Sequence, residues 1–397
     1  MTDGQGVTFA RGFVAGAIAA GVKQAGTARL DVAVIASTAV HCHAAGVFTT
    51  NQVIAAPCVV TKKHVGRGHL RGIVVNSGNA NACTGPQGER DAVAMSTAAA
   101  ELLKVDSIAL AVASTGVIGV PLPMDRIIPA IGRVALSTDG WDAASRAIMT
   151  TDTRPKVAQR ELMLAGGAVR IGGIAKGAGM IHPNMATLLT FVTTDALIDS
   201  AALRPMLRSA ADDSFNAISV DGDTSTNDTL LVLANGASGV RVGTLDGLAF
   251  LDALTAVCLD LARAIVADGE GATKVFEVRV TGAASENDAR AAARTVTTSN
   301  LVKTAIHGAD PNWGRILAAV GRSGARIDAA KASVRIGGIA VFEKGAPRAF
   351  EASAVRTVFE KADIAIEVDL GMGAATARAW GTDLSAEYVR INADYTT

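Results

Sequence analysis

The strongest constraint on the fold is an alternation between short runs rich in valine and isoleucine and longer stretches rich in alanine. Valine and isoleucine favour strands, whereas apolar positions that recur every three or four residues favour helices. In the first part of the chain this pattern predicts strands at 31–37, 72–78 and 108–115 and a helix at 89–104. The alternation indicates an α/β fold.

The same alternation continues toward the C-terminus. Further helices are predicted at 121–136, 141–150, 201–215, 248–267 and 285–297. Further strands are predicted at 187–196, 229–236, 274–283, 333–342, 364–371 and 376–383. With 397 residues, the chain exceeds the roughly 250–300 residues at which a single core stops growing. We therefore expect two lobes or one large layered body.

The charge balance and the cysteines narrow the class of protein. Lys plus Arg and Asp plus Glu both number 37, so the formal net charge is zero and we expect no nucleic-acid partner. The four cysteines form no CxxC pair, which is typical of a reducing compartment. The apolar segment 12–21 is short and rich in Ala and Gly, unlike a secretory signal, and no stretch approaches the roughly 20 apolar residues of a membrane span. These features predict a cytoplasmic enzyme that acts on small molecules and has no membrane partner.

Several common active-site motifs are absent. The segment KGAGMIH (176–182) lacks the last glycine of a dinucleotide-binding loop, and no P-loop, HExxH or GxSxG sequence occurs. His41, Cys42 and His43 lack a nearby carboxylate or cysteine pair that would complete a tetrahedral site, so we expect no metal. No histidine lies in a recognisable nucleophile motif, so a Ser-His-Asp arrangement stays open but has no positive support.

One threonine occupies a position that suits a nucleophile. In HPNMATLLT (182–190), Thr187 lies where an irregular segment enters an apolar strand. A threonine hydroxyl is a weak nucleophile, but an adjacent N-terminal amine, with a pKa of about 7.7–8.0, can act as its base once the preceding peptide bond is cut. Taken alone, Thr187 is more simply explained as a structural threonine of a strand, because such threonines are common.

A series of motifs changes this interpretation. In chain order they are NSGNANACTGP (76–86), ASTGVIG (113–119), AIMTTDTRPK (147–156), GGIAKGAGMIHPNMATLLTFVTTDA (172–196), DTSTNDT (223–229), DGEGATK (268–274), LVKTAIHGADPNWGR (301–315) and YVRINADYTT (388–397). Together they resemble the ornithine acetyltransferase family, also called the glutamate N-acetyltransferase or arginine-biosynthesis bifunctional family. The resemblance runs from about residue 12 to residue 397.

The resemblance implies self-cleavage. The bond between Ala186 and Thr187 is expected to be cut, which gives subunits 1–186 and 187–397, and Thr187 then becomes the acetyl-accepting nucleophile with its own amine as base. The glycine-rich segment 172–180 is expected to form a strained loop before the scissile bond, because glycine tolerates conformations that other residues avoid.

The resemblance also assigns roles to residues around the nucleophile. Thr115 and Gly116 match an oxyanion-hole pair, a hydroxyl and a backbone N–H that face the charge of the tetrahedral intermediate. The positions that bind the acetylated amino acid, together with Thr187, are Thr150, Lys176, Glu270, Asn392 and Thr397. The residue types suit this role, since a cation binds an α-carboxylate and a carboxylate binds an amine. The strong matches at 221–228 and 310–315 receive no role.

The implied reaction is transfer of acetyl from N2-acetylornithine to glutamate through an acetyl-Thr187 intermediate, with no bound cofactor or metal. Family members differ in whether acetyl-CoA is also a donor and in whether they serve arginine biosynthesis or secondary metabolism, and no motif here decides either point. The implied fold is a layered α-β-β-α sandwich with a smaller C-terminal α/β lobe, and the implied assembly is an α2β2 heterotetramer. Two other functions stay open: a self-processing aminopeptidase of related architecture, and a non-catalytic binding protein.

Overall fold

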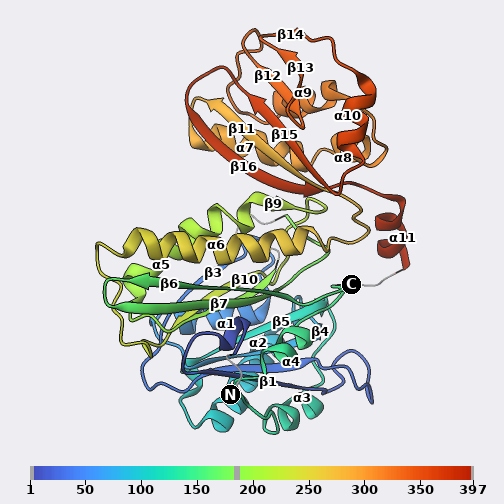
Figure 1. The fold of residues 1–397 in the computed structure, drawn as a ribbon. Coiled ribbons are helices and arrows are strands. Elements are labelled where there is room, and N and C mark those ends of the chain that lie inside the picture. Colours follow the sequence, from blue (N-terminus) through green and yellow to red (C-terminus); the bar gives the residue numbers. More distant parts are fainter. Residues whose placement is uncertain (1–3, 183–187, 395–397) are drawn as a thin grey trace.

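The computed structural model describes residues 4–182 and 188–394, and Ala186, Thr187 and Thr397 lie outside the described residues. Figure 1 shows two parts: a larger body that contains most of the chain up to α6, and a smaller C-terminal lobe above it. Helices and strands alternate in both parts, so the predicted α/β class is confirmed.

The first sheet of the body has the strand order β1-β2-β4-β5. Its strands are β1 (Phe13–Ile18), β2 (Val32–Ser37), β4 (Gly72–Asn79) and β5 (Leu110–Val117). β2 is antiparallel to both β1 and β4, whereas β4 and β5 are parallel and place Gly78 beside Gly116. The carboxyl ends of β4 and β5 therefore lie together at one edge of the sheet.

The second sheet has the strand order β3-β10-β8-β7-β6. Its strands are β3 (His43–Phe48), β6 (Lys156–Leu164), β7 (Gly167–Lys176), β8 (Leu189–Thr194) and β10 (Thr229–Ala234). All residues of β8 and β10 are buried, as expected for strands covered on both faces. In β7 and β8, Lys176 pairs with Leu189, so the end of one strand lies beside the start of the other.

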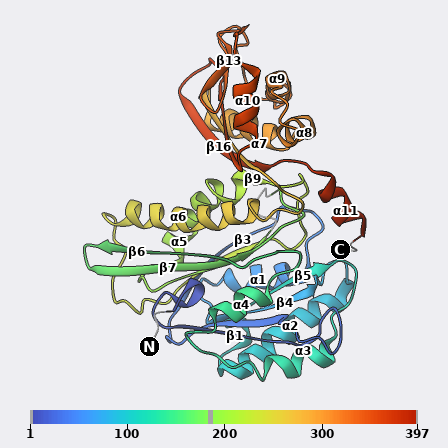
Figure 2. The same ribbon diagram turned by 45° about the vertical axis from the view of Figure 1, so that its right-hand side comes forward.

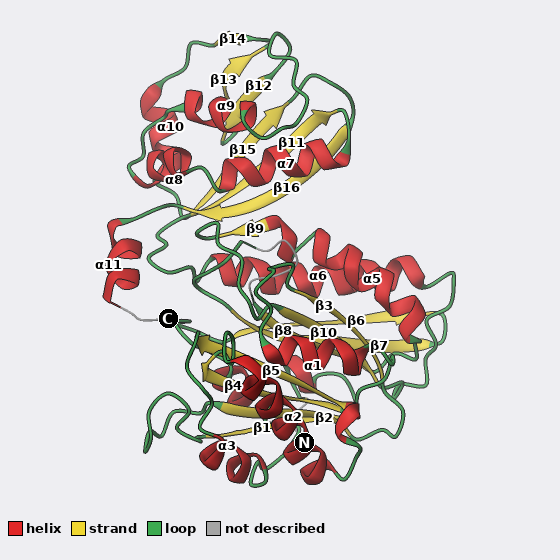
Figure 3. Cartoon of the chain, turned by 180° about the vertical axis from the view of Figure 1, so that it is seen from behind, coloured by secondary structure: helices red, strands yellow, loops and turns green. Residues whose placement is uncertain are grey.

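Apolar side chains join the two sheets of the body. One hydrophobic core contains Phe13, Ile35 and Ile73 from the first sheet and Phe191 and Leu231 from the second. The outer face of the second sheet packs on α5 (Ser200–Asp212) and α6 (Gly247–Val266), and that of the first packs on α2 (Gly85–Leu103) and α3 (Met124–Ile131). Figures 2 and 3 show these helices outside the two sheets. The remaining helices of the body are α1 (Ala56–Val65) and α4 (Trp141–Ala147).

The C-terminal lobe has one sheet and a core of its own. Its strand order is β14-β13-β12-β15-β11-β16-β9, with β9 (Ile218–Ser219), β11 (Val275–Ala283), β12 (Ser333–Ile336), β13 (Ile339–Glu343), β14 (Ala346–Pro347), β15 (Asp363–Asp369) and β16 (Ala375–Thr382). Its helices are α7 (Glu286–Thr297), α8 (Asn300–His307), α9 (Trp313–Gly321) and α10 (Ala352–Phe359). Because β9 comes from the chain of the body, the sheet links the two parts (Figure 1). The final helix, α11 (Ala386–Asp394), leaves the lobe and returns alongside the body.

Three sequence predictions are wrong in their boundaries. The segment 333–342 is not one strand but the hairpin β12-β13, because Gly337 and Gly338 both have positive φ, 58° and 83°, and form its turn. The glycine-rich segment 172–180 is not a loop throughout, since its first five residues complete β7. The helix predicted at 121–136 spans only Met124–Ile131 and is followed by Gly132.

Candidate active site

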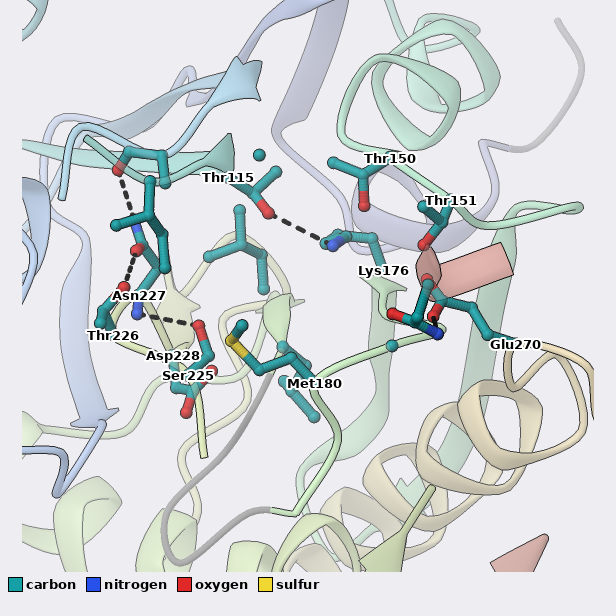
Figure 4. Close-up of a pocket in the computed structure, with 17 residues that line it drawn as sticks. Thr115, Thr150, Thr151, Lys176, Met180, Ser225, Thr226, Asn227, Asp228 and Glu270 are labelled. Carbon is teal, nitrogen blue, oxygen red and sulfur yellow. Dashed lines mark hydrogen bonds between the residues drawn. The ribbon is translucent and has the colours of Figure 1, made fainter. Parts of the chain in front are cut away.

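A pocket lies where the carboxyl ends of β5 and β7 meet the start of β8. It encloses about 770 Å³ when its open mouth is counted. Its lining residues are Ala80, Thr115, Gly116, Ile118, Thr150, Thr151, Lys176, Gly179, Met180, Leu188, Leu189, Ser225, Thr226, Asn227, Asp228, Glu270 and Asn392. Figure 4 shows these side chains around a common space.

The pocket brings together all of the predicted site residues that the structure describes. Thr115, Gly116, Thr150, Lys176, Glu270 and Asn392 come from five separate segments of the chain and line the same space. Thr187 and Thr397 lie outside the described residues, but Leu188, the residue that follows Thr187 in the chain, is part of the lining.

The end of β5 supplies the pair Thr115 and Gly116. The Thr115 hydroxyl accepts a hydrogen bond from the Lys176 ammonium at 3.2 Å. Gly116 has a φ of 129°, and a Cβ at this position would lie 2.1 Å from the carbonyl oxygen of Gly78 on β4. Glycine is therefore required at this position near the end of β5, because a side chain would clash with β4 and other residues rarely adopt this φ.

Lys176 ends β7 and is buried. Burial lowers the pKa of this lysine, and the charge of Asp152 opposes the shift most strongly. Lys156 lowers the pKa further, whereas Glu270 and Asp228 raise it. The ammonium group thus lies among carboxylates that stabilise its charge in a desolvated site. A cation held in this way can bind the carboxylate of a ligand.

Three buried ionic residues lie behind the pocket, and none of them was among the predicted site residues. Asp152 and Asp268 both form ion pairs with the Lys156 ammonium. Burial alone would raise the pKa of Asp152, but the charges of Lys176 and Lys156 and the hydrogen bonds of the carboxylate hold it at about 2. Asp152 is therefore ionised at neutral pH. Asp152 and Lys156 lie in the matching motif 147–156 and Asp268 in the motif 268–274, but the resemblance implied no role for them, and only the fold brings the two segments together.

Glu270 and Asn392 form the opposite side of the pocket. The Asn392 amide donates a hydrogen bond to Glu270 Oε2 at 3.0 Å, which joins α11 to the segment after α6. The Glu270 N–H donates to the carbonyl oxygen of Ala178 at 3.0 Å. A Cβ on Gly179 would lie 2.4–2.5 Å from the Glu270 carboxylate, so glycine leaves the space that this carboxylate fills.

The segment before β10 closes the back of the pocket. The Asn227 amide donates to the carbonyl oxygens of Ala80 and Ser114, at 2.6 and 2.9 Å, and so ties this segment to the first sheet. Asp228 is buried, and its Oδ2 atom has no hydrogen-bond partner. Burial raises the pKa of Asp228 well above its usual value, although a hydrogen bond from the Leu188 N–H and the charge of Lys176 oppose the shift. Asp228 lies in the matching segment 221–228, for which the resemblance implied no role.

The described chain before the gap at 183–187 is held firmly. Met180 has a φ of 55°, a left-handed conformation that costs roughly 1–2 kcal/mol in a residue with a Cβ. The Asp221 carboxylate accepts hydrogen bonds from the Met180 and Ile181 N–H groups, at 2.6 and 2.9 Å, which fixes this conformation. Met180 is the last residue of the segment 172–180, for which a strained loop was expected.

His182 joins this segment to the lobe. The Arg294 guanidinium on α7 donates to His182 Nε2 at 2.9 Å, so the other ring nitrogen, Nδ1, carries the hydrogen and lies 3.2 Å from the Ser219 hydroxyl. Burial and the charge of Arg294 lower the pKa of His182 to about 4. The imidazole is therefore neutral at physiological pH.

A metal cluster and a membrane-spanning helix are both absent from the residues that the structure describes. Within 4–182 and 188–394, no group of three or more His, Cys, Asp or Glu side chains could hold a metal ion. Of the helices that the structure describes, none has the length and apolar character needed to cross a membrane.

The fold and the pocket define an α/β protein of two parts whose site presents a cation, a carboxylate and an amide to a small charged molecule. A family model for the ArgJ family matches residues 14–397, and the chain belongs to this family. It is 53% identical over 397 residues to the arginine biosynthesis bifunctional protein ArgJ of Symbiobacterium thermophilum, with 99% of this chain and 98% of that protein covered. It is 48% identical over 400 residues to the protein of the same name from Dehalococcoides mccartyi, with coverage of 100% and 98%. The crystal structure of the arginine biosynthesis bifunctional protein ArgJ from Bacillus halodurans is similar at 44% identity and a TM-score of 0.51, over 52% of this chain and 98% of that one.

Proposed function

We propose that this protein is a self-cleaving glutamate N-acetyltransferase that moves acetyl from N2-acetylornithine to glutamate. The observation that carries the proposal is the convergence of Thr115, Gly116, Lys176, Glu270 and Asn392 on one pocket whose lining includes the neighbour of Thr187 in sequence. Membership of a family whose relatives are named for arginine biosynthesis supports the same assignment.

The first reaction of the proposal is self-cleavage. The Thr187 hydroxyl attacks the carbonyl carbon of Ala186, the amide becomes an ester through an N-to-O shift, and water hydrolyses the ester. The products are a fragment of residues 1–186 and a fragment of residues 187–397 that begins with a free amine. The firmly held chain from Met180 to His182 supports this step, because it fixes the approach to the scissile bond.

The second reaction is acetyl transfer in two halves. The amine of Thr187 takes the proton of its own hydroxyl, and the oxygen attacks the acetyl carbonyl of N2-acetylornithine. The Thr115 hydroxyl and the Gly116 N–H stabilise the negative charge on the tetrahedral oxygen. The C–N bond then breaks, the proton goes to the leaving amine, and ornithine departs from acetyl-Thr187. The amine of glutamate attacks this ester by the same route and leaves as N-acetylglutamate.

The walls of the pocket supply the binding groups. Lys176 receives the α-carboxylate of the substrate, and Glu270 receives its amine, with Asn392 holding the Glu270 carboxylate in place. Thr150 and Thr397 complete the proposed substrate site. The reaction balances without a bound cofactor or metal. Acetyl-CoA, as an alternative donor, would form the same acetyl-Thr187 intermediate.

The proposal extends to the layers and the assembly. The hydrophobic core between the two sheets and the helices on their outer faces support the α-β-β-α sandwich expected for the family. We also propose that the two fragments stay together and pair as an α2β2 heterotetramer.

Mass spectrometry after incubation with single substrates tests the reaction. With N2-acetylornithine alone, the fragment 187–397 should gain the mass of one acetyl group, and free ornithine should appear in an equal amount. Glutamate added next should remove that mass and yield N-acetylglutamate. Steady turnover with no glutamate present would instead indicate the aminopeptidase alternative, in which water is the acceptor, and no acetylation or turnover at all would support the non-catalytic binding protein. A parallel incubation with acetyl-CoA and glutamate determines whether both donors are accepted.

A further inference from the structure

The three buried ionic residues behind the pocket form what we call the ion cluster: Asp152, Lys156 and Asp268. Their side chains are 0%, 0% and 4% exposed, and none of them lines the pocket. The Lys156 ammonium lies between the two carboxylates and forms an ion pair with each. The ion cluster therefore lies outside the lining of the pocket and acts through the residues that it holds.

Asp152 holds the cationic side of the pocket. Its Oδ2 atom accepts the Thr150 N–H at 2.9 Å, and its Oδ1 atom accepts the Gly177 N–H at 2.7 Å. Gly177 follows Lys176, so one carboxylate joins the two separate segments that carry Thr150 and Lys176. With Lys156 as a third donor, both of its oxygens are occupied by protein groups.

Asp268 holds the anionic side. Its carboxylate accepts the Thr153 N–H at 3.0 Å and the Thr153 hydroxyl. It lies two residues before Glu270 in the short segment that follows α6. Because Lys156 pairs with Asp152 and Asp268 together, a single ammonium group connects the segment of Lys176 to the segment of Glu270.

Stability alone does not explain this arrangement. The cost of removing charges from water offsets much of the attraction in a buried ion pair, and apolar residues of similar volume often stabilise a protein equally well or better. In the ion cluster, however, all four carboxylate oxygens accept hydrogen bonds, and a network bonded in this way holds its groups in one geometry. The ion cluster thus has the properties of a device that fixes positions.

We propose that the ion cluster is a positioning unit that fixes the spacing between Lys176 and Glu270, and so selects ligands whose carboxylate and amine match this spacing. The inference rests on the proposed function, because it takes these two residues as the groups that bind the substrate. It assigns Asp152, Lys156 and Asp268 a role in specificity without contact to the reacting atoms.

The test compares Asp152→Asn with the wild type and with Asp142→Asn, which removes an exposed carboxylate paired with Arg146 on α4. An asparagine side chain has one acceptor oxygen where Asp152 uses two, so a donor of the network loses its partner. Two quantities are measured: the dissociation constant of ornithine by calorimetry, and the ratio of kcat/KM for N2-acetylornithine to that for N2-acetyllysine, which is one methylene longer.

The expected result for Asp152→Asn is ornithine binding that is weaker by about tenfold or more and a preference for N2-acetylornithine that falls by a similar factor. Asp142→Asn should leave both unchanged. The ratio of two substrates is the decisive quantity, because a general loss of folded protein lowers both rates equally and leaves the ratio constant. An unchanged ratio and dissociation constant would overturn the inference.

A second variant covers the case in which Asp152→Asn does not fold because Lys156 is left partly unpaired. The triple variant Asp152→Asn, Lys156→Met and Asp268→Asn removes all three charges, leaves no buried charge without its partner, and should restore folding. It should still bind ornithine weakly and discriminate poorly. If the triple variant folds and retains wild-type discrimination, the ion cluster has only a structural role. A wild type that binds ornithine but transfers no acetyl contradicts the proposed function, while the calorimetry still decides the inference.

Discussion

The body and the C-terminal lobe are both α/β structures, but they bury their sheets differently. In the body, β2, β8 and β10 are buried along their whole length, because helices or the other sheet cover both faces. In the lobe, β15 alternates between buried and exposed positions, as in a sheet covered on one face. This difference explains why the pocket lies in the body. The ends of the body's strands surround a partly enclosed space, and charged groups interact strongly there.

The lobe reaches the site only through supporting contacts. No described residue of β11 to β16 or of α7 to α10 lines the pocket. Instead, Arg294 contacts His182, and Lys303 on α8 donates hydrogen bonds to the carbonyl oxygens of Val220 and Thr382, at 2.7 and 2.6 Å. We therefore expect changes in the body to affect chemistry first and changes in the lobe to affect stability first.

The largest expected effect is that of Thr115→Ala in the body. Loss of one oxyanion-hole donor typically lowers kcat by ~10²–10³-fold. The measurement is kcat per cleaved molecule, with the exposed helical Thr97→Ala as a control that should keep wild-type activity. A variant of Thr115 that loses stability but keeps its kcat would assign this threonine to the architecture of the strand end.

Lys303→Met in the lobe should produce the opposite pattern. It removes the donor to Val220 O, Thr382 O and Thr382 Oγ1, and buried acceptors without partners cost roughly 1–3 kcal/mol. Denaturant unfolding should therefore show a loss of that size, whereas KM for N2-acetylornithine in the folded fraction should stay near the wild-type value. A large change in KM with unchanged stability would mean that the lobe takes part in substrate binding.

The contact between His182 and the lobe should give a smaller, pH-dependent effect. The folded-state pKa of about 4 lies below the 6.5 of an unperturbed histidine, so the unfolded chain binds more protons between these pH values. The contribution of His182 to stability is thus fully present above pH 6.5 and is lost as the pH falls toward 4. Unfolding midpoints measured over this range should depend less on pH in His182→Gln than in the wild type. The exposed His41→Gln should follow the wild type, and identical slopes for all three proteins would contradict this assignment.

The smallest expected effect is that of Gly179→Ala. Gly179 does not have a positive φ, so an alanine fits the backbone, but its Cβ would displace the Glu270 carboxylate. KM for N2-acetylornithine should rise by about a few-fold, because the displaced carboxylate loses only part of the free energy of one charge-assisted hydrogen bond to the substrate. The free energy of unfolding should change little. Gly247→Ala at the start of α6 is the matched control, because its Cβ meets only the Met206 side chain at an ordinary 3.5 Å. An unchanged KM would show that Glu270 adjusts freely or does not bind the substrate.

Much of the fold could be predicted from periodicity, and the errors have local causes. The helix predicted at 285–297 corresponds to α7, whose first turn Ser285 caps by accepting the Asp288 N–H. The hairpin β12-β13 was missed because its flanking residues alternate as in a single strand, and only the positive φ of two glycines reverses the chain. The residues Gly172 and Gly173 suggested a loop, yet they lie in β7, where Gly172 leaves space for the backbone at Gly6.

The site was predictable where the resemblance to a known family assigns a role to a residue. Thr115, Lys176 and Glu270 lie in motifs that match a known family, and the pocket brings them together. Asp152, Lys156 and Asp268 could not be assigned a joint role, because a buried ion pair depends on which strands and loops meet and leaves no periodic signal in the sequence. The strain at Met180 likewise depends on a hydrogen-bond acceptor, Asp221, that is distant in the chain.

The most direct test of a self-cleaving acetyltransferase is the intact mass of the purified protein beside that of Thr187→Ala. The wild type should give two fragments, 1–186 and 187–397, and the variant should remain one chain of 397 residues. A wild type that also remains a single chain would contradict Thr187 as a nucleophile released by cleavage, and would favour a binding protein that retains the pocket.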